Sequence, residues 1–315
     1  MIRPLPLFAI AAAMLLVIAA PTRAADVSLS PRWTPGEEVV FTYTSDSIRR
    51  DSLPAIQSTK EQRTRQDMTF RRKVIETGPS GTTLELIFDR IKVVVTQGRM
   101  FMAYDSQKPP EPDRSNVLED AAAPMLGVPL TVKLNAENEV TSITGFPEPR
   151  TVDGAIRPLI VDDELIRNSI ASMYGMQKKP ASAKVGDRWI MDETLPNEPG
   201  TVLAIRHHRT LQSADDKSAV IVTNGTADIR PVTPGARSKR LLGEFDLTST
   251  HHWDRTNGRI GWMVMEQRTL MHGEFKQART DHITIVRLTL AAEGFTPPEP
   301  PKPPPGPALA PTATP

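Results

Sequence analysis

The fold class of this chain is decided by the stretch from Gly81 to Thr96, which reads GTTLELIFDRIKVVVT. Apolar and polar residues alternate along it, as is typical of a strand with one buried face. The apolar positions fall into two sets of opposite parity: Leu84, Leu86 and Phe88, then Ile91, Val93 and Val95. A strict period of two cannot bury both sets in one core. We therefore expect a β-bulge near Asp89-Arg90 that bends the strand, or else two ends that pack against different layers.

Strand-like patterns of β-branched, aromatic and alternating apolar residues continue on both sides of this stretch. In the first half the other predicted strands lie at 39–44, 62–77, 99–104, 131–134 and 139–143. In the second half they lie at 188–191, 201–211, 218–229, 241–253, 259–271 and 282–290. Within 62–77 we expect Met68, Phe70 and Val74 to point inward. The chain is therefore predicted to be mainly β.

Two helices and one tight turn are also predicted. The segment 161–174 has acidic residues in its first turn and apolar residues at helical spacing, which predicts an amphipathic helix. A short helix is predicted over 116–123, with Ser115 as its N-cap and Pro124 after its end. The dipeptide Asn257-Gly258 predicts a two-residue hairpin turn between two long strands.

These elements divide the chain into two β-rich halves. We predict a mainly β protein with two curved antiparallel sheets or half-barrels and one connecting helix. The predicted units are a signal peptide at 1–24, an N-terminal β-rich unit at 25–150, a connecting helix at 151–180, a C-terminal β-rich unit at 181–294 and a disordered proline-rich tail at 295–315. Ten of the 30 prolines fall between Pro297 and Pro315, which favours an extended strip over a packed segment.

The N-terminus has the pattern of an export signal. Arg3 supplies a positive start, the run 5–20 is almost entirely apolar, and Ala24 ends a small-residue cleavage site. The apolar run is shorter than the roughly 20 residues that a membrane-spanning helix needs. We therefore expect cleavage near Ala24, a periplasmic or secreted protein, and no transmembrane segment in the mature chain.

Charge and cysteine content exclude several classes of protein. Lys and Arg total 38 against 37 Asp and Glu, so the chain lacks the basic excess of a general nucleic-acid binder. A sequence without cysteine excludes disulfides, thiolate catalysis, cysteine zinc sites and a lipid anchor on an N-terminal cysteine. Hydrophobic residues make up 39% of the chain and charged residues 24%, which favours a globular core over general disorder.

All six histidines lie in the second half of the chain: His207, His208, His251, His252, His272 and His282. Adjacent histidines on a strand point to opposite faces, so neither adjacent pair can chelate one ion. If their strands are neighbours, His207 and His251 can meet on one face. A metal site needs three or four ligands, so His272 or Glu274 would have to join them. We favour histidines that are individually hydrogen-bonded or exposed, and we predict no cofactor.

The acidic pairs also favour structural roles. They are Asp162-Asp163, Asp192-Glu193 and Asp215-Asp216. The first pair suits a helix start, and the last suits a turn before a strand. General acid–base catalysis needs two carboxylates that converge across a cleft, and nothing in these spacings demands that arrangement. No catalytic residue is therefore assigned.

Two further clusters have a structural and a functional interpretation. The basic run from Lys60 to Lys73 is either the solvated side of a strand or a face for anionic lipid or glycan, and we favour the solvated side. Met263 and Met265 share one strand face. Ordinary core packing is favoured there over contact with an irregular apolar ligand.

The order of segments also resembles a known family. The likeness is carried by residues 81–92, Tyr104-Asp105-Ser106, 126–132, 139–145 and Val185-Gly186-Asp187-Arg188-Trp189. Together with the predicted helix, these segments are similar to an uncharacterised family of exported bacterial β-rich proteins, a domain of unknown function. The resemblance covers most of residues 33–290. It implies an exported β-rich protein and supplies no catalytic residues.

Binding or an envelope-structural role is therefore favoured over catalysis. The first hypothesis is an exported envelope protein that binds an amphiphilic or apolar ligand, such as a lipid, on the concave side of a curved sheet. The phase-shifted strand at 82–96 and the Met/Trp-rich strand at 262–271 motivate it. The alternative is a non-catalytic structural or adapter protein that docks an envelope protein partner through its proline-rich tail. A metal-dependent hydrolase is the third hypothesis.

Overall fold

The computed structural model of the chain describes residues 26–109, 116–147, 182–198, 200–232, 241–275 and 278–298. Within these residues the protein is mainly β, as predicted, with long antiparallel strands and one short α-helix. The predicted signal peptide, the helix predicted over 161–174 with its Asp162-Asp163 pair, and the tail beyond 298 lie outside the described residues.

The strands of the first half are β1 (Val27–Ser28), β2 (Glu38–Leu53), β3 (Ser58–Gly78), β4 (Gly81–Gln97), β5 (Met100–Asp105), β6 (Pro129–Leu134) and β7 (Val140–Thr144). Those of the second half are β8 (Ser182–Ala183), β9 (Arg188–Glu198), β10 (Thr201–Ala214), β11 (Ser218–Pro231), β12 (Leu241–Asp254), β13 (Arg259–Phe275) and β14 (Ala278–Ala292). Every strand predicted from the sequence is present. Most extend further than predicted, because ladder pairing continues through polar residues that carry no apolar signal.

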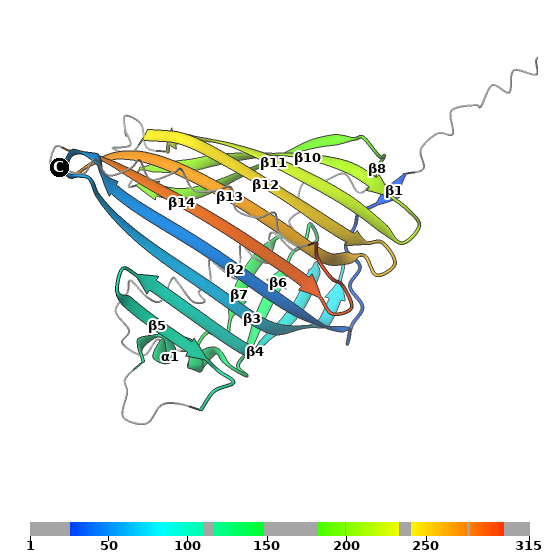
Figure 1. The fold of residues 1–315 in the computed structure, drawn as a ribbon. Coiled ribbons are helices and arrows are strands. Elements are labelled where there is room, and N and C mark those ends of the chain that lie inside the picture. The colour runs from blue at the N-terminus through cyan, green and yellow to red at the C-terminus, as the bar shows by residue number, and fades with distance from the viewer. Residues whose placement is uncertain are drawn as a thin grey trace, which may run out of the picture.

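The strands form one large curved antiparallel sheet and a small sheet of β1 and β8 (Figure 1). The large sheet has 12 strands in the order β7-β6-β4-β3-β2-β14-β13-β12-β11-β10-β9, with β5 also paired to β4. Strands β2 and β14 pair from Phe41 opposite Ala292 to Ser52 opposite Asp281. The last strand of the second half therefore lies beside the first long strand of the first half. The large sheet is open, because β7 and β9 end the order of its described strands.

A β-bulge absorbs the phase change within β4, as the sequence predicts. Phe88 pairs with Phe70 of β3, but Arg90 pairs with Thr69, so Asp89 is the extra residue. Both parity sets are then buried in the same core, each side chain at most 5% exposed: Leu84, Leu86, Phe88, Ile91, Val93 and Val95. The bulge, and not a division between two layers, is therefore what reconciles the two halves of the strand.

The larger core lies on one face of the large sheet. The ring of Phe41 stacks on Phe70 with 5.4 Å between centroids, and Phe70 contacts Phe88 at 5.7 Å. We call the face that carries these rings the inner face. Residues directly opposite each other on neighbouring strands share a face, so the strand registers assign the inner face on every strand. In the second half it continues into a smaller core around Ile221, which also contains Leu29.

The short helix α1 (Val117–Ala122) is present, but its predicted cap is wrong. Asn116, not Ser115, is the N-cap, and its side-chain oxygen accepts a hydrogen bond from the backbone N–H of Leu118 at 3.1 Å. Asparagine is itself a preferred N-cap residue, so the helix begins one residue later. The 3₁₀ turns η1 (Pro54–Ile56) and η2 (Ala123–Met125) complete the helical elements that are described. None of the described helices has the length and apolar character needed to cross a bilayer.

The predicted two-residue turn between β12 and β13 is also wrong. Asp254 pairs with Arg259, so the connection is the longer loop 255–258. The Asp254 carboxylate accepts hydrogen bonds from the backbone N–H groups of Thr256 at 3.0 Å and Asn257 at 3.2 Å. These side-chain contacts stabilise the longer loop, an effect that a dipeptide signal does not include.

Candidate functional site

A band of buried polar side chains crosses the inner face in the second half of the sheet. It consists of His207 and Arg209 on β10, Thr223 on β11, and Ser249 and His251 on β12, and we call it the polar band. Arg209 lies opposite Thr223, and Thr223 lies opposite Ser249. Each of the five residues is at most 8% exposed. Because burying polar groups is costly, a band of this size makes the inner face the candidate site.

Hydrogen bonds orient both histidines of the polar band. His207 Nε2 lies 2.8 Å from Oε2 of Glu193, which belongs to the neighbouring strand β9. His251 Nε2 lies 2.9 Å from the hydroxyl of Ser249 on its own strand. These bonds fix both imidazole rings against the sheet, so the band presents a defined polar surface.

Arg209 supplies the charge of the polar band. Burial lowers the pKa of Arg209 to about 10, and the negative charge of Glu193 acts in the opposite direction. A group with this pKa stays protonated at neutral pH. The band therefore keeps a positive charge within a largely apolar surface, where an anion stabilises it more than in water.

Thr223 is the most buried residue of the band, at 2% exposure. Its hydroxyl oxygen is enclosed and has no hydrogen-bond partner among the described residues. An unpaired buried hydroxyl costs free energy, so this position is not optimised for stability alone.

Replacing Thr223 with Val is expected to raise the free energy of unfolding by about 1 kcal/mol, because valine keeps the shape and removes the unpaired hydroxyl. Urea unfolding measures the change. The matched control is Thr280→Val, where the hydroxyl lies 3.1 Å from His282 Nε2 and the residue is 6% exposed. That variant is expected to lose about 1 kcal/mol. An equal loss in both variants would mean that Thr223 is paired in the folded protein.

Arg209, Thr223 and Ser249 form a row of directly opposed residues, which continues onto β13 and β14 with apolar side chains. Met265 of β13 lies opposite Ser249, and Leu288 of β14 lies opposite Met265. Both apolar side chains are half-buried, and Leu288 packs against the edge of the larger core. By contrast, Met263 is 2% exposed and belongs to that core, which confirms ordinary packing for it. The inner face thus changes from polar to apolar along one row of paired residues.

The strand order does not bring the histidines together as a metal site would require. Strand β11 lies between β10 and β12, so His207 and His251 are not on neighbouring strands. His272 Nδ1 lies 2.8 Å from Asp281, and Glu274 is exposed. Within the described ranges, no three His, Cys, Asp or Glu side chains are grouped closely enough to hold a metal ion.

The remaining histidines have separate surroundings. His282 Nδ1 lies 2.7 Å from the carboxylate of Asp51 on β2. His252 stacks on Trp262 with 5.6 Å between ring centroids, and burial lowers the pKa of His252. His208 is exposed. His282 and His208 agree with the interpretation of individually bonded or exposed histidines. His252 departs from it, because it is half-buried and stacked and its Nδ1 has no hydrogen-bond partner among the described residues.

The acidic pairs that can be placed have different roles. Asp192 pairs with Arg206 at 3.0 Å on the outer face, whereas Glu193 contacts the polar band. Asp215 forms the predicted turn before β11. It accepts hydrogen bonds from the backbone N–H groups of Lys217 at 2.8 Å and Ser218 at 2.7 Å, and these bonds lower the pKa of Asp215.

The basic run on β3 is divided between the two faces of the sheet. On the outer face, Arg63 Nε donates to Asp46 at 2.8 Å, and Arg71 Nε donates to Asp89 at 2.8 Å. Arg72 has the opposite parity, and its side chain is 1% exposed. The outer side of β3 is therefore a surface of mixed charge, and one arginine of the run is part of the interior.

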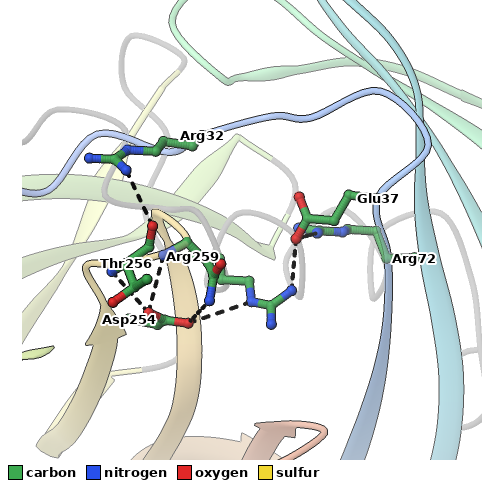
Figure 2. A network of polar contacts seen from close by, with 7 residues as sticks. Arg32, Glu37, Arg72, Asp254, Thr256 and Arg259 are labelled. Atoms are coloured by element: carbon green, nitrogen blue, oxygen red, sulfur yellow. Dashed lines mark hydrogen bonds and ion pairs between the residues drawn. The ribbon is translucent and has the colours of Figure 1, made fainter. Parts of the chain in front are cut away.

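Figure 2 shows the polar network that surrounds Arg72. Glu37 Oε1 lies 3.3 Å from Arg72 and 2.7 Å from Arg259, which in turn lies 3.8 Å from Asp254. The guanidinium of Arg72 also lies 5.3 Å from the centroid of the Trp33 ring. The network joins the segment before β2, strand β3 and the β12–β13 loop, so it connects the two halves of the chain. We assign it a structural role.

Sequence reasoning counted Arg72 with the surface arginines, although a signal for its burial was present. Arg72 has the same parity as Met68, Phe70 and Val74, which were expected to point inward. A similar signal existed for Arg209, which has the parity of the apolar residues of its own strand. The charge of Arg72 was given more weight than its parity, and Arg209 was not considered as a candidate residue.

No protein-family model and no curated protein matches the chain. Among solved structures, DynF from the dynemicin biosynthesis pathway of Micromonospora chersina is 8% identical over 86% of each chain, with a TM-score of 0.19. Pseudomonas aeruginosa OpdQ is 7% identical over 82% of this chain and 99% of its own, with a TM-score of 0.23. An outer membrane channel from Pseudomonas putida F1 is 7% identical over 84% and 97%, with a TM-score of 0.19. These scores are too low to support any conclusion about fold or activity.

Proposed function

We propose that this chain is an exported binding protein that holds an amphiphilic ligand on the inner face of its curved sheet. One observation carries the proposal. In a single row of paired residues, Arg209, Thr223 and Ser249 are followed by Met265 and Leu288. One end of this row offers a charge and two hydroxyl groups, and the other offers half-buried apolar side chains.

An amphiphile matches both ends of this row. Its apolar chain gains roughly 25 cal/mol for each Å² of apolar surface removed from water. Its polar group can form hydrogen bonds with the polar band, which compensates the cost of leaving water. The export signal predicted at residues 1–24 agrees with a ligand from the cell envelope.

The arrangement of the histidines favours binding over acid–base catalysis. His207 is bonded to Glu193, and His251 is bonded to Ser249. Each imidazole therefore interacts with its own neighbour, and β11 separates the two strands that carry them. Acid–base catalysis instead needs groups that converge on one reacting atom.

Binding of N-phenyl-1-naphthylamine, an apolar dye that fluoresces when it leaves water, tests the proposal. The wild-type protein is expected to give a saturable rise in fluorescence. Ser47 lies on the inner face, opposite Thr64 and Val286. Ser47→Trp is expected to weaken dye binding by about tenfold or more, because the indole occupies the ligand's surface.

The matched control is Ile48→Trp. Ile48 is the next residue on β2, is half-buried like Ser47, and points to the outer face. Its variant is expected to bind the dye like the wild type. Native mass spectrometry of protein purified from the envelope should also show a bound amphiphile. An apo mass, together with neither dye binding nor thermal stabilisation by lipids, would contradict the proposed function.

A further inference from the structure

We infer that the ligand has an anionic head group, which Arg209, Thr223 and Ser249 bind, while its apolar chain lies over Met265 and Leu288. The ligand class named here rests on the proposed function and makes it specific: an amphiphile that ends in a carboxylate or a phosphate.

The three polar side chains project from adjacent strands at one level of the inner face. Arg209 is opposite Thr223, which is opposite Ser249. Neighbouring strands lie about 4.8 Å apart, so the backbones of Arg209 and Ser249 are separated by roughly 10 Å, with Thr223 between them. Side chains at this spacing can direct several donors at one head group that has two or three oxygens.

The donors match an anion. The guanidinium of Arg209 is planar and presents N–H groups in a fork that fits carboxylate and phosphate oxygens. The hydroxyl of Thr223 can donate to the same group, and it has no other partner among the described residues. Ser249 adds a second hydroxyl beside His251 Nε2, at 2.9 Å. Hydrogen bonds from such donors to an anion are stronger than those to a neutral head group.

Glu193 is an acidic residue of the same face whose charge acts on Arg209. Glu193 lies opposite Ile205, whereas Arg209 lies opposite Trp189. On each strand the two residues are i and i+4, so all four lie on the same face. Glu193 Oε2 lies 2.8 Å from His207 Nε2, so the carboxylate interacts with the far side of the polar band. Arg209 keeps its proton beside this carboxylate and is the cationic residue of the row.

Displacement of N-phenyl-1-naphthylamine by probes with the same twelve-carbon chain tests the head group. Dodecanoate and dodecyl phosphate are anionic, dodecyl maltoside is neutral and dodecyltrimethylammonium is cationic; all are used below their micelle concentrations. We expect at least one anionic probe to bind about tenfold or more tighter than the neutral probe, and the cationic probe to bind most weakly. The ranking of dodecanoate against dodecyl phosphate distinguishes a carboxylate head group from a phosphate one.

Three variants locate the head group. Arg209→Gln is expected to remove the preference for anions, so that the anionic probes bind no tighter than dodecyl maltoside, and Arg209→Lys is expected to keep part of the preference. Thr223→Val is expected to weaken binding of the anionic probe by about fivefold to tenfold, although it stabilises the protein without ligand. Thr223→Val also carries the test if Arg209→Gln does not fold.

The possible failures are distinguishable. Equal binding of all four probes by the wild type would overturn the anionic head group and leave the proposed function intact. A preference for anions that survives in both Arg209→Gln and Thr223→Val would place the head group elsewhere and overturn the assignment. If neither the dye nor any probe binds, the proposed function itself fails.

Discussion

Deletion of Ile87 is expected to prevent the first half of the large sheet from folding. The shortened β4 can keep its pairing with β3 at both ends only if it loses the bulge. Phe88 then moves to the outward position of Ile87, and Asp89 moves to the core position of Phe88. Phe88 is 5% exposed and packs on Phe70. Losing a core phenylalanine costs about 3–5 kcal/mol, and burying an unpaired carboxylate costs several more. This cost is comparable to the whole stability of a typical domain, about 5–15 kcal/mol.

The matched control is deletion of Asp89, the bulge residue itself. Without Asp89, only Arg90 separates Phe88 from Ile91, so both point to the core without a bulge. Each core residue of β4 keeps its partner on β3. The variant loses the ion pair with Arg71 and the local bend, so we expect cooperative unfolding with a loss of less than about 2 kcal/mol. Circular dichroism and urea unfolding compare the two deletions. Equal damage from both would show that the bulge does not set the phase of β4.

Replacing Glu37 with Gln is expected to lower the free energy of unfolding by about 2–4 kcal/mol. Glu37 is the anionic partner of Arg72 and Arg259, whose side chains are 1% and 17% exposed. Glutamine has nearly the same size but no charge, so it leaves two largely buried cations without this counter-charge. Urea unfolding monitored by tryptophan fluorescence measures the loss.

Glu38→Gln is the control for this substitution. Glu38 is the next residue, and its carboxylate lies 3.6 Å from Arg71, with both side chains well exposed at 44% and 38%. Exposed ion pairs contribute little, so the expected loss is below about 0.5 kcal/mol. If Glu37→Gln is as mild as Glu38→Gln, the network of Figure 2 does not stabilise the junction between the two halves.

The positions of the strands could be predicted because alternation is a local property. The parity of the apolar residues in β4 predicted a bulge at Asp89-Arg90 as one of two solutions. The structure chose the bulge, because both sets lie in one core. Local signals were less reliable at the ends of elements. Asn116 replaced Ser115 as a cap, and the contacts of Asp254 lengthened a hairpin loop, because alternatives of similar free energy compete at such positions.

The candidate site could be predicted only in part. Parity placed His207 and His251 on apolar strand faces, and both are buried there. It did not show that β11 separates their strands, nor that Thr223 and Ser249 complete a row with Arg209. The members of that row come from separate strands, so their neighbours depend on strand order and register.

The sequence by itself determined that this chain forms long antiparallel strands, which side chains of β4 are buried, and where the phase of its alternation changes. These outcomes depend on steric preferences and on hydrophobic alternation between residues close together in the chain. Only the tertiary structure decided that β2 pairs with β14, that Arg72 is enclosed by Glu37 and Trp33, and that a polar row meets an apolar one on the inner face. Such contacts join residues far apart in the chain. They form because their combined free energy exceeds the entropy cost of bringing those segments together.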